Sequence, residues 1–306
     1  MTRRDKAELV IVGAGIFGLW TAWAALRRGL DVTVLEAAEV VGAGASGGVV
    51  GALAPHMPER WTPKKQFQLE ALLVLPDELR AVEAAAGLPT GFRRAGRIVP
   101  LVSEAARVRA KARLADAAAR WPVDLPMRLG GADDWPGWLA PEAAPFGIVE
   151  DAITAQLDPA ATCRALAAAL EAGGVRVRYG CAVRAVGPGR VEWDGGGMDA
   201  EAVMLAAGVA GFDLIAPLVG EVPGRAEKGQ ALLLDLDGGV RPLIYSNGLY
   251  VISHDTGGVA VGATSERVFE GDGPDAMLDD VLARARAFCP MLAGATVRRR
   301  WAGLRP

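Results

Sequence analysis

The first forty residues change hydrophobic period twice. An unbroken apolar run at residues 9–12 (LVIV) is typical of a buried strand, and it ends in the glycine turn GAGIFG at 13–18. Apolar residues at helical spacing follow in LWTAWAALRRG, where Gly29 is a helix-stop residue. A second strand, DVTVLEA, covers residues 31–37. The pattern predicts a βαβ unit with parallel strands and a right-handed crossover.

The rest of the chain adds helices and then short antiparallel strands. Helices are expected at residues 66–86, 103–120, 158–174 and 275–292. Strands are expected at 175–187, 190–195, 200–208, 230–237, 248–253, 258–264 and 297–306. Pro76 should kink or restart the first of these helices, and residues 121–147 should be irregular. An α/β start followed by an antiparallel sheet predicts two interleaved domains.

Composition narrows the kinds of partner. Of 306 residues, 51% are hydrophobic and the formal net charge is −3, which argues against a general nucleic-acid binder. Two histidines, and three cysteines without a CxxC motif, disfavour a metal centre or a disulfide framework. The apolar run at 203–212 is too short to span a membrane, and the N-terminus lacks a signal-type cleavage site. We therefore expect a cytoplasmic protein that is not integral to a membrane.

Gly13, Gly15 and Gly18 form a G-x-G-x-x-G motif after a strand and at the start of a helix. The first glycine permits a tight turn, the second lets a pyrophosphate approach, and the third lets the helix pack on the strand. Free N–H groups at the helix N-terminus can then hold the phosphate charge. Glu36 ends the second strand, where a carboxylate bonds ribose hydroxyls and disfavours NADP. These features alone do not separate NAD from FAD.

Four stretches in a fixed order carry a family resemblance. They are GAGIFG with Glu36, GASGGVVGALAP, LAAG ending at Gly208, and the pair VAVGATSE and WAGLRP. By these stretches the sequence resembles the FAD-dependent D-amino acid oxidase superfamily, and most of all its glycine oxidase and sarcosine oxidase-like amine oxidases. The resemblance implies a Rossmann-like FAD domain of the glutathione reductase type. An antiparallel-sheet α+β substrate domain would be interleaved with it.

The expected domain boundaries follow from that resemblance. The FAD-binding domain is expected to be discontinuous, with residues 1–85, 150–222 and 297–306. The substrate domain is expected to take residues 86–149 and 223–296.

The resemblance also implies which residues hold FAD, without a covalent bond because no attachment motif is evident. The loop at 44–52 would follow the diphosphate to the flavin ring, and its small residues permit a close backbone approach. Val183 matches the strand residue at the adenine, while Ala207 and Gly208 match a turn over the nucleotide; from sequence alone, each could equally be an ordinary strand residue. The FAD-binding candidates are Gly13, Gly15, Ile16, Phe17, Gly18, Glu36, Ala37, Gly44, Ala45, Ser46, Val50, Gly51, Ala52, Val183, Ala207 and Gly208.

Three residues are candidates for the substrate side. Arg305 occupies the arginine position of the family's GLRP motif, which holds the substrate carboxylate, and a guanidinium fork suits that group. Tyr250 matches a tyrosine that lines the pocket, although it could equally be a core aromatic residue. His56 follows GALAP and should lie near the reactive side of the flavin.

The resemblance implies oxidation of the C–N bond of a small amino acid or N-substituted amino acid of the glycine, sarcosine or D-amino acid type. Hydride would pass to flavin N5, and water would hydrolyse the imine. Oxygen or an electron-transfer protein would reoxidise the flavin, and a homo-oligomer is possible. Two alternatives stay open: a 2-hydroxy acid dehydrogenase, and a flavin-binding subunit or oxidase domain in tRNA modification.

The sequence stops just after WAGLRP, where family members continue for some tens of residues. We therefore expect the native chain to be longer and these 306 residues alone to hold FAD poorly.

Overall fold

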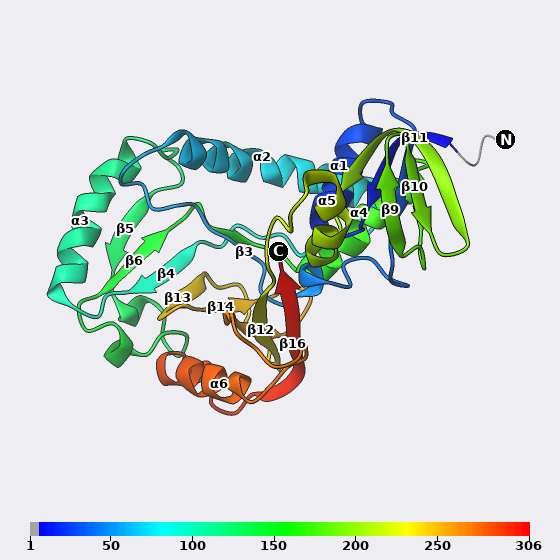
Figure 1. The fold of residues 1–306 in the computed structure, drawn as a ribbon. Helices are drawn as coiled ribbons and strands as arrows, with labels where there is room; N and C mark the ends of the chain where they lie inside the picture. The colour runs from blue at the N-terminus through cyan, green and yellow to red at the C-terminus, as the bar shows by residue number, and fades with distance from the viewer. Residues whose placement is uncertain (1–5) are drawn as a thin grey trace.

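The computed structural model describes residues 6–306, and most of its strands lie in two large sheets (Figure 1). The first sheet has the order β8-β2-β1-β11-β10-β9. Its strands are β1 (Lys6–Val12), β2 (Val32–Leu35), β8 (Arg176–Arg178), β9 (Val183–Gly187), β10 (Arg190–Trp193) and β11 (Gly196–Leu205). The first four strands in that order run parallel, and β10 and β9 continue the sheet antiparallel. The predicted βαβ unit is present, with α1 (Ile16–Leu26) between β1 and β2.

The second sheet has eight strands in the order β16-β12-β15-β14-β13-β4-β6-β5. They are β4 (Arg97–Pro100), β5 (Met127–Gly130), β6 (Ile148–Asp151), β12 (Glu227–Asp235), β13 (Leu243–Ser246), β14 (Leu249–Ser253), β15 (Val259–Gly262) and β16 (Thr296–Arg305). All neighbours pair antiparallel except β13 and β4. The α/β fold class with an antiparallel second sheet is therefore confirmed.

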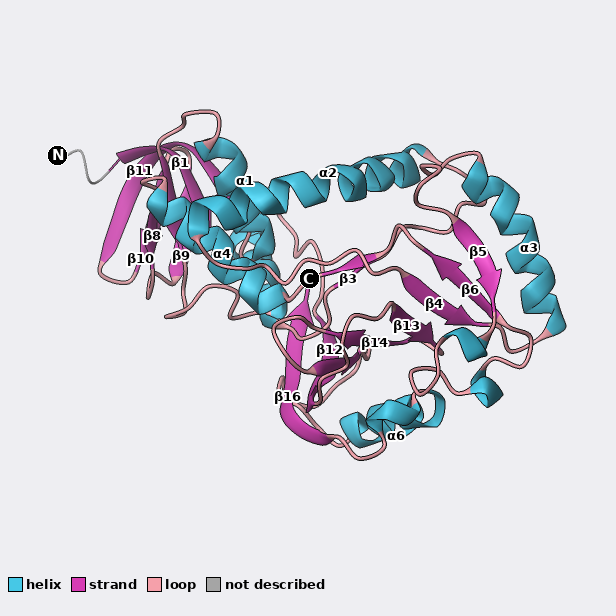
Figure 2. Ribbon diagram, turned by 180° about the vertical axis from the view of Figure 1, so that it is seen from behind, coloured by secondary structure: helices cyan, strands magenta, loops and turns pink. Residues whose placement is uncertain are grey.

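A small third sheet lies between the two large ones. β3 (Ala52–Leu53) pairs with β7 (Ala155–Gln156), and both views place β3 near the centre of the molecule (Figures 1 and 2). The C-terminal end of β16 is also central in both views. The junction between the sheets thus receives β3 and the end of β16.

Five further helices cover the sheets: α2 (Pro63–Ala86), α3 (Glu104–Ala118), α4 (Pro159–Ala172), α5 (Gly211–Val219) and α6 (Met277–Phe288). Asp158 caps α4 as expected, accepting a hydrogen bond of 2.9 Å from the Ala161 N–H. The helix does not restart at Pro76, since α2 is a single helix containing that residue; a kink there stays a prediction. Buried Leu69 and Leu79, on either side of Pro76, hold both halves of the helix in the core.

Two expectations need qualification. The stretch 121–147 is not wholly irregular, because β5 forms within it and pairs with β6. The domain boundaries stay a prediction; residues 297–306, assigned to the FAD-binding part, lie largely in β16 and pair with β12 in the eight-stranded sheet. Within residues 6–306, no helix combines the length and the apolar character that a bilayer crossing requires.

Candidate active site

The glycine turn after β1 has the geometry that the motif predicts. Gly13 has φ +105°, and a Cβ there would lie 2.5 Å from the Ala206 carbonyl oxygen. A Cβ on Gly18 would lie 1.9 Å from the Gly13 carbonyl oxygen, so α1 packs directly on the turn. Gly15 precedes α1, whose first turn contains Ile16 and the exposed Phe17. The N-terminus of α1 therefore lies next to the C-terminal end of β1, and residues 13–15 between them carry no bulky side chain.

Replacing Gly18 with alanine should disrupt this turn. The added methyl group has no room beside the Gly13 carbonyl, so α1 must move away from β1, and both folding stability and FAD content should fall. Gly294→Ala is the matched control, because a Cβ there meets nothing within 4 Å. Urea denaturation and the flavin-to-protein absorbance ratio measure both effects. Wild-type values for Gly18→Ala would contradict the close contact.

Glu36 is tied to the same turn. Its carboxylate accepts hydrogen bonds from the N–H of Ala14 at 2.7 Å and of Ala38 at 2.9 Å. Ala37, between Glu36 and Ala38 in the sequence, is exposed. The Cys181 N–H donates a hydrogen bond of 2.8 Å to the Glu36 carbonyl oxygen. This last bond brings the segment leading to Val183 beside the end of β2. The carboxylate of Glu36, the candidate for the ribose, and the candidate adenine strand are thus neighbours.

The turn at Ala207 and Gly208 lies against Gly13, the first glycine of the G-x-G-x-x-G motif. The position of a Cβ on Gly13 lies 2.9 Å from the Ala207 Cα, and the Ala206 N–H bonds the Val12 carbonyl at 2.8 Å. Gly208 is exposed and has φ +58°. The structure therefore brings these two candidates to Gly13.

The loop from Gly44 to Ala52 runs from the fingerprint to the second sheet. Ser46, in a short 3-10 helix at Ala45–Gly47, accepts a hydrogen bond of 3.0 Å from the Ile16 N–H. A Cβ on Gly51 would lie 1.9 Å from the Leu157 carbonyl oxygen, and Ala52 begins β3. Gly44 is exposed, with open space around it. The candidate FAD residues of this loop thus extend from the N-terminus of α1 to the centre of the molecule.

One face of the eight-stranded sheet turns toward that loop. An apolar cluster joins Val49, Val50 and Ala52 to residues of this face, among them Tyr245, Tyr250 and Trp301. The two tyrosines oppose each other across β13 and β14, with ring centroids 4.7 Å apart. Burial raises the pKa of Tyr250, so its hydroxyl stays protonated at neutral pH and can donate a hydrogen bond. The other face packs against α6.

Arg305 projects over the same face as Trp301, because the two residues are four positions apart on one strand. Its Nη2 donates to Ser265 Oγ at 3.0 Å, Glu227 Oε1 at 3.2 Å and the Thr264 carbonyl at 3.3 Å. The guanidinium lies over Gly229, with its carbon 3.4 Å from where a Cβ would stand, an ordinary contact distance. Among residues 6–306, Nε and Nη1 have no hydrogen-bond partner, so these two donors can receive an anion.

The two histidines have different environments. His56 is exposed and makes no hydrogen bond with residues 6–306, and its position near the reactive side of the flavin stays a prediction. His254 is buried, and its Nε2 lies 2.8 Å from the Val49 carbonyl oxygen. Burial lowers the pKa of His254, so the ring is neutral at pH 7 and Nε2 donates this bond. His254 therefore anchors the Gly44–Ala52 loop to the residue that follows β14.

A buried ion pair on the tyrosine side of the sheet was missed from the sequence. Arg97 Nε lies 2.7 Å from Asp151 Oδ2, and their side chains are 4% and 1% exposed. Arg97 pairs with Leu243, which belongs to the same face as Tyr250. Fifty-four residues separate the two partners, and only the pairing of β4 with β6 brings them together. The available signal was a charged residue at the end of a short apolar run, in RIVP and in IVED.

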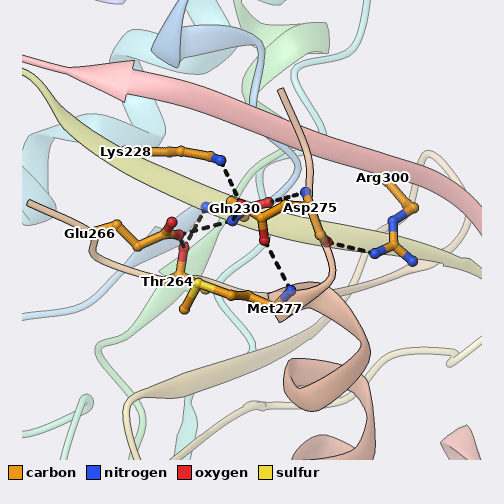
Figure 3. Close-up of polar contacts among 7 residues, drawn as sticks. All are labelled: Lys228, Gln230, Thr264, Glu266, Asp275, Met277 and Arg300. Atoms are coloured by element: carbon orange, nitrogen blue, oxygen red, sulfur yellow. Dashed lines mark hydrogen bonds and ion pairs between the residues drawn. The ribbon is translucent and has the colours of Figure 1, made fainter. Parts of the chain in front are cut away.

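A polar network surrounds Lys228 and Gln230 of β12 (Figure 3). These residues alternate with Glu227, which is opposite Arg305, so their side chains point to the other face of the sheet. The fully buried Lys228 donates to Asp275 Oδ2 at 2.7 Å, and Gln230 Nε2 donates to the same oxygen at 2.8 Å. Gln230 also bonds Glu266 at 3.0 Å, and Glu266 accepts from the Thr264 hydroxyl. These contacts fix the segment whose Thr264 carbonyl and neighbouring Ser265 hold Arg305.

Acid should weaken this network through Asp275. Hydrogen bonds from Lys228, and then from Gln230, lower the pKa of Asp275 to about 2 from an ordinary 3.8. A depressed pKa contributes stability that is complete above the ordinary value and is lost as pH falls through about 2. Asp275→Asn should therefore flatten the loss of stability between about pH 4 and pH 2. Urea denaturation at stepped pH tests this, with the exposed Asp272→Asn as control; parallel pH profiles for Asp275→Asn and wild type would refute it.

Comparison with known proteins identifies the class. Residues 8–306 match the family described as DAO, FAD dependent oxidoreductase. The chain belongs to this family, so it is an FAD-dependent oxidoreductase, and the expected enzyme class and cofactor are confirmed. No group of three or more metal-ligating side chains occurs within residues 6–306.

Individual relatives indicate which members of the family this chain is similar to. A protein of Rhizobium etli named as a thiamine biosynthesis oxidoreductase, ThiO, is 30% identical over 98% of this chain and 84% of its own length. The bifunctional ThiO/ThiG protein of Trichormus variabilis is 28% identical, and the chain spans only 46% of it. The crystal structure of glycine oxidase from Geobacillus kaustophilus superposes with a TM-score of 0.86 at 20% identity, covering 99% of this chain and 83% of the other. This structural likeness confirms the fold.

Proposed function

We propose that the protein oxidises the C–N bond of a small amino acid or N-substituted amino acid. The observation that carries this proposal is Arg305, whose side chain lies on the sheet face that turns toward the Gly44–Ala52 loop. Its Nε and Nη1 donors have no partner among residues 6–306. A planar guanidinium binds a carboxylate bidentately and keeps its charge at any working pH. The names ThiO and glycine oxidase among the relatives support the same substrate class.

The residues present fit FAD. The crowded Gly13–Gly18 turn, the N-terminus of α1 and Glu36 would hold the diphosphate and ribose without a covalent bond. When bound, FAD supplies the hydride acceptor. Arg305 fixes the substrate carboxylate, the Tyr250 hydroxyl can donate to the substrate, and the apolar cluster around Val49 excludes water. Besides the reduced flavin, the product would be an imine, which water hydrolyses.

Anaerobic reduction of the flavin tests the proposal. Glycine, sarcosine and D-alanine should bleach the 450 nm band, whereas 2-hydroxyglutarate should not. Bleaching by the hydroxy acid alone would replace the proposal with a 2-hydroxy acid dehydrogenase. Peroxide formation in air would then distinguish an oxidase from an enzyme that passes electrons to a partner protein. The cytoplasmic location and any homo-oligomer remain predictions.

A further inference from the structure

A carboxylate stands beside the anion-binding arginine, and no step above uses it. Glu227 is the residue directly opposite Arg305 in the β12–β16 ladder, so their side chains lie on one face. Glu227 Oε1 accepts from Arg305 Nη2 at 3.2 Å and from the Ser265 hydroxyl. An acid within a site for anions weakens their binding unless the ligand also carries a positive or N–H donating group.

The second oxygen of Glu227 is nearly free. Among the residues that the structure describes, Oε2 accepts one long bond, of 3.4 Å, from Nε of Arg267, whose side chain is 71% exposed. The Glu227 side chain is 32% exposed, so a ligand bound at Arg305 can reach it. The Ser265 hydrogen bond, followed by those of Arg267 and the charge of Arg305, lowers the pKa of Glu227. The carboxylate therefore stays ionised at physiological pH and is a weak base.

We propose that Glu227 is a specificity-determining residue that binds the amine of the substrate while Arg305 binds its carboxylate. The proposal rests on the proposed function and deepens it. The positive charge of Arg305 and the negative charge of Glu227 lie next to each other. They complement the negative carboxylate and the positive ammonium group of an amino acid. Because Glu227 is a weak base, it orients the N–H groups and leaves their proton to be lost to water. The pair favours amino acids over hydroxy acids of the same size, since only the amine adds a positive charge.

Two ligands of matched shape isolate this contact. Sarcosine and methoxyacetate share a carboxylate and a methyl group, but oxygen replaces the amine in methoxyacetate. The FAD-loaded protein is first reduced with dithionite in the absence of oxygen, so that its flavin accepts no hydride and sarcosine binds without reacting. Calorimetric titration of this reduced protein gives an equilibrium Kd for each ligand. We expect the wild type to prefer sarcosine, and Glu227→Gln to reduce that preference about tenfold. Methoxyacetate should bind the variant at least as tightly as the wild type.

The glutamine retains an acceptor oxygen for Arg305 and Ser265, so it removes the charge while keeping the positioning contacts. Glu221→Gln, an exposed residue before β12, is the matched control and should keep the wild-type ratio. An unchanged ratio in Glu227→Gln would overturn the proposal. So would equal tightening of both ligands, which would make Glu227 a competitor for Arg305. The Kd ratio is read without turnover, so failure of sarcosine to bleach the flavin would count against the proposed function alone.

Discussion

Replacing Arg305 with alanine is expected to raise KM for carboxylate-bearing amines about 100-fold, while flavin content stays at the wild-type level. Two charge-assisted hydrogen bonds to a partly exposed carboxylate account for roughly 3 kcal/mol, which corresponds to about that factor. Flavin content should be unaffected because the predicted FAD contacts lie at the Gly13 turn and the Gly44–Ala52 loop. Steady-state kinetics and the ratio of absorbance at 450 nm to that at 280 nm measure the two quantities.

Arg299→Ala is the matched control for Arg305. It removes an exposed arginine from the same strand, six residues earlier, where no hydrogen bond to residues 6–306 is lost. Its KM should stay near the wild-type value. A KM for Arg305→Ala equal to that of Arg299→Ala would remove Arg305 from the substrate site. Loss of flavin in Arg305→Ala would instead assign the residue a role in holding the cofactor.

Replacing Asp151 with alanine should cost about 3–5 kcal/mol of folding free energy, because it leaves the Arg97 charge buried without a partner. The Arg97–Asp151 pair is almost wholly shielded from water, and Asp151 also accepts the Thr154 N–H at 2.9 Å. Removing both charges in Arg97→Met/Asp151→Leu should restore much of the loss, since an apolar pair can replace a buried ion pair. Urea denaturation of the three proteins gives the comparison.

The neighbouring pair Arg128–Glu150 supplies the control. It joins the adjacent strands β5 and β6, but Arg128 is 69% exposed. Arg128→Met should therefore change stability by less than about 1 kcal/mol. If Asp151→Ala is no more destabilising than Arg128→Met, the Arg97 charge is not held as the structure shows.

Sequence reasoning succeeded where the signal was local. The glycine turn next to Glu36 and the Asp158 cap each depend on local sequence, and the structure has both features. The roles of the glycines and of Glu36 in holding FAD stay predictions. The position of Arg305 came from family resemblance, and its role remains a prediction. What surrounds Arg305 was not foreseen, because Ser265 and Glu227 are 40 and 78 residues away from it. Such cross-strand neighbours depend on register, and a single sequence does not encode register visibly.

The same dependence on strand pairing explains why the burial of Arg97 and Lys228 was not predicted. Each is a charged residue inside a strand, and from sequence alone each is compatible with a solvent-facing position. Sheet order decides otherwise: β4 pairs with β6, and the segment after β15 folds back over β12. Buried charges of this kind become predictable only when the partner strand is known.

The β12–β16 ladder shifts register once, between Leu233 and Leu234, where Arg298 is the additional residue on β16. Changes in chain length have unequal consequences on the two sides of this bulge. A residue gained or lost before it can be absorbed in the turn that follows α6. A residue gained or lost between Arg299 and Arg305 would rotate the arginine to the face that α6 covers. Homologous sequences should therefore tolerate insertions ahead of the bulge and keep the spacing after it constant.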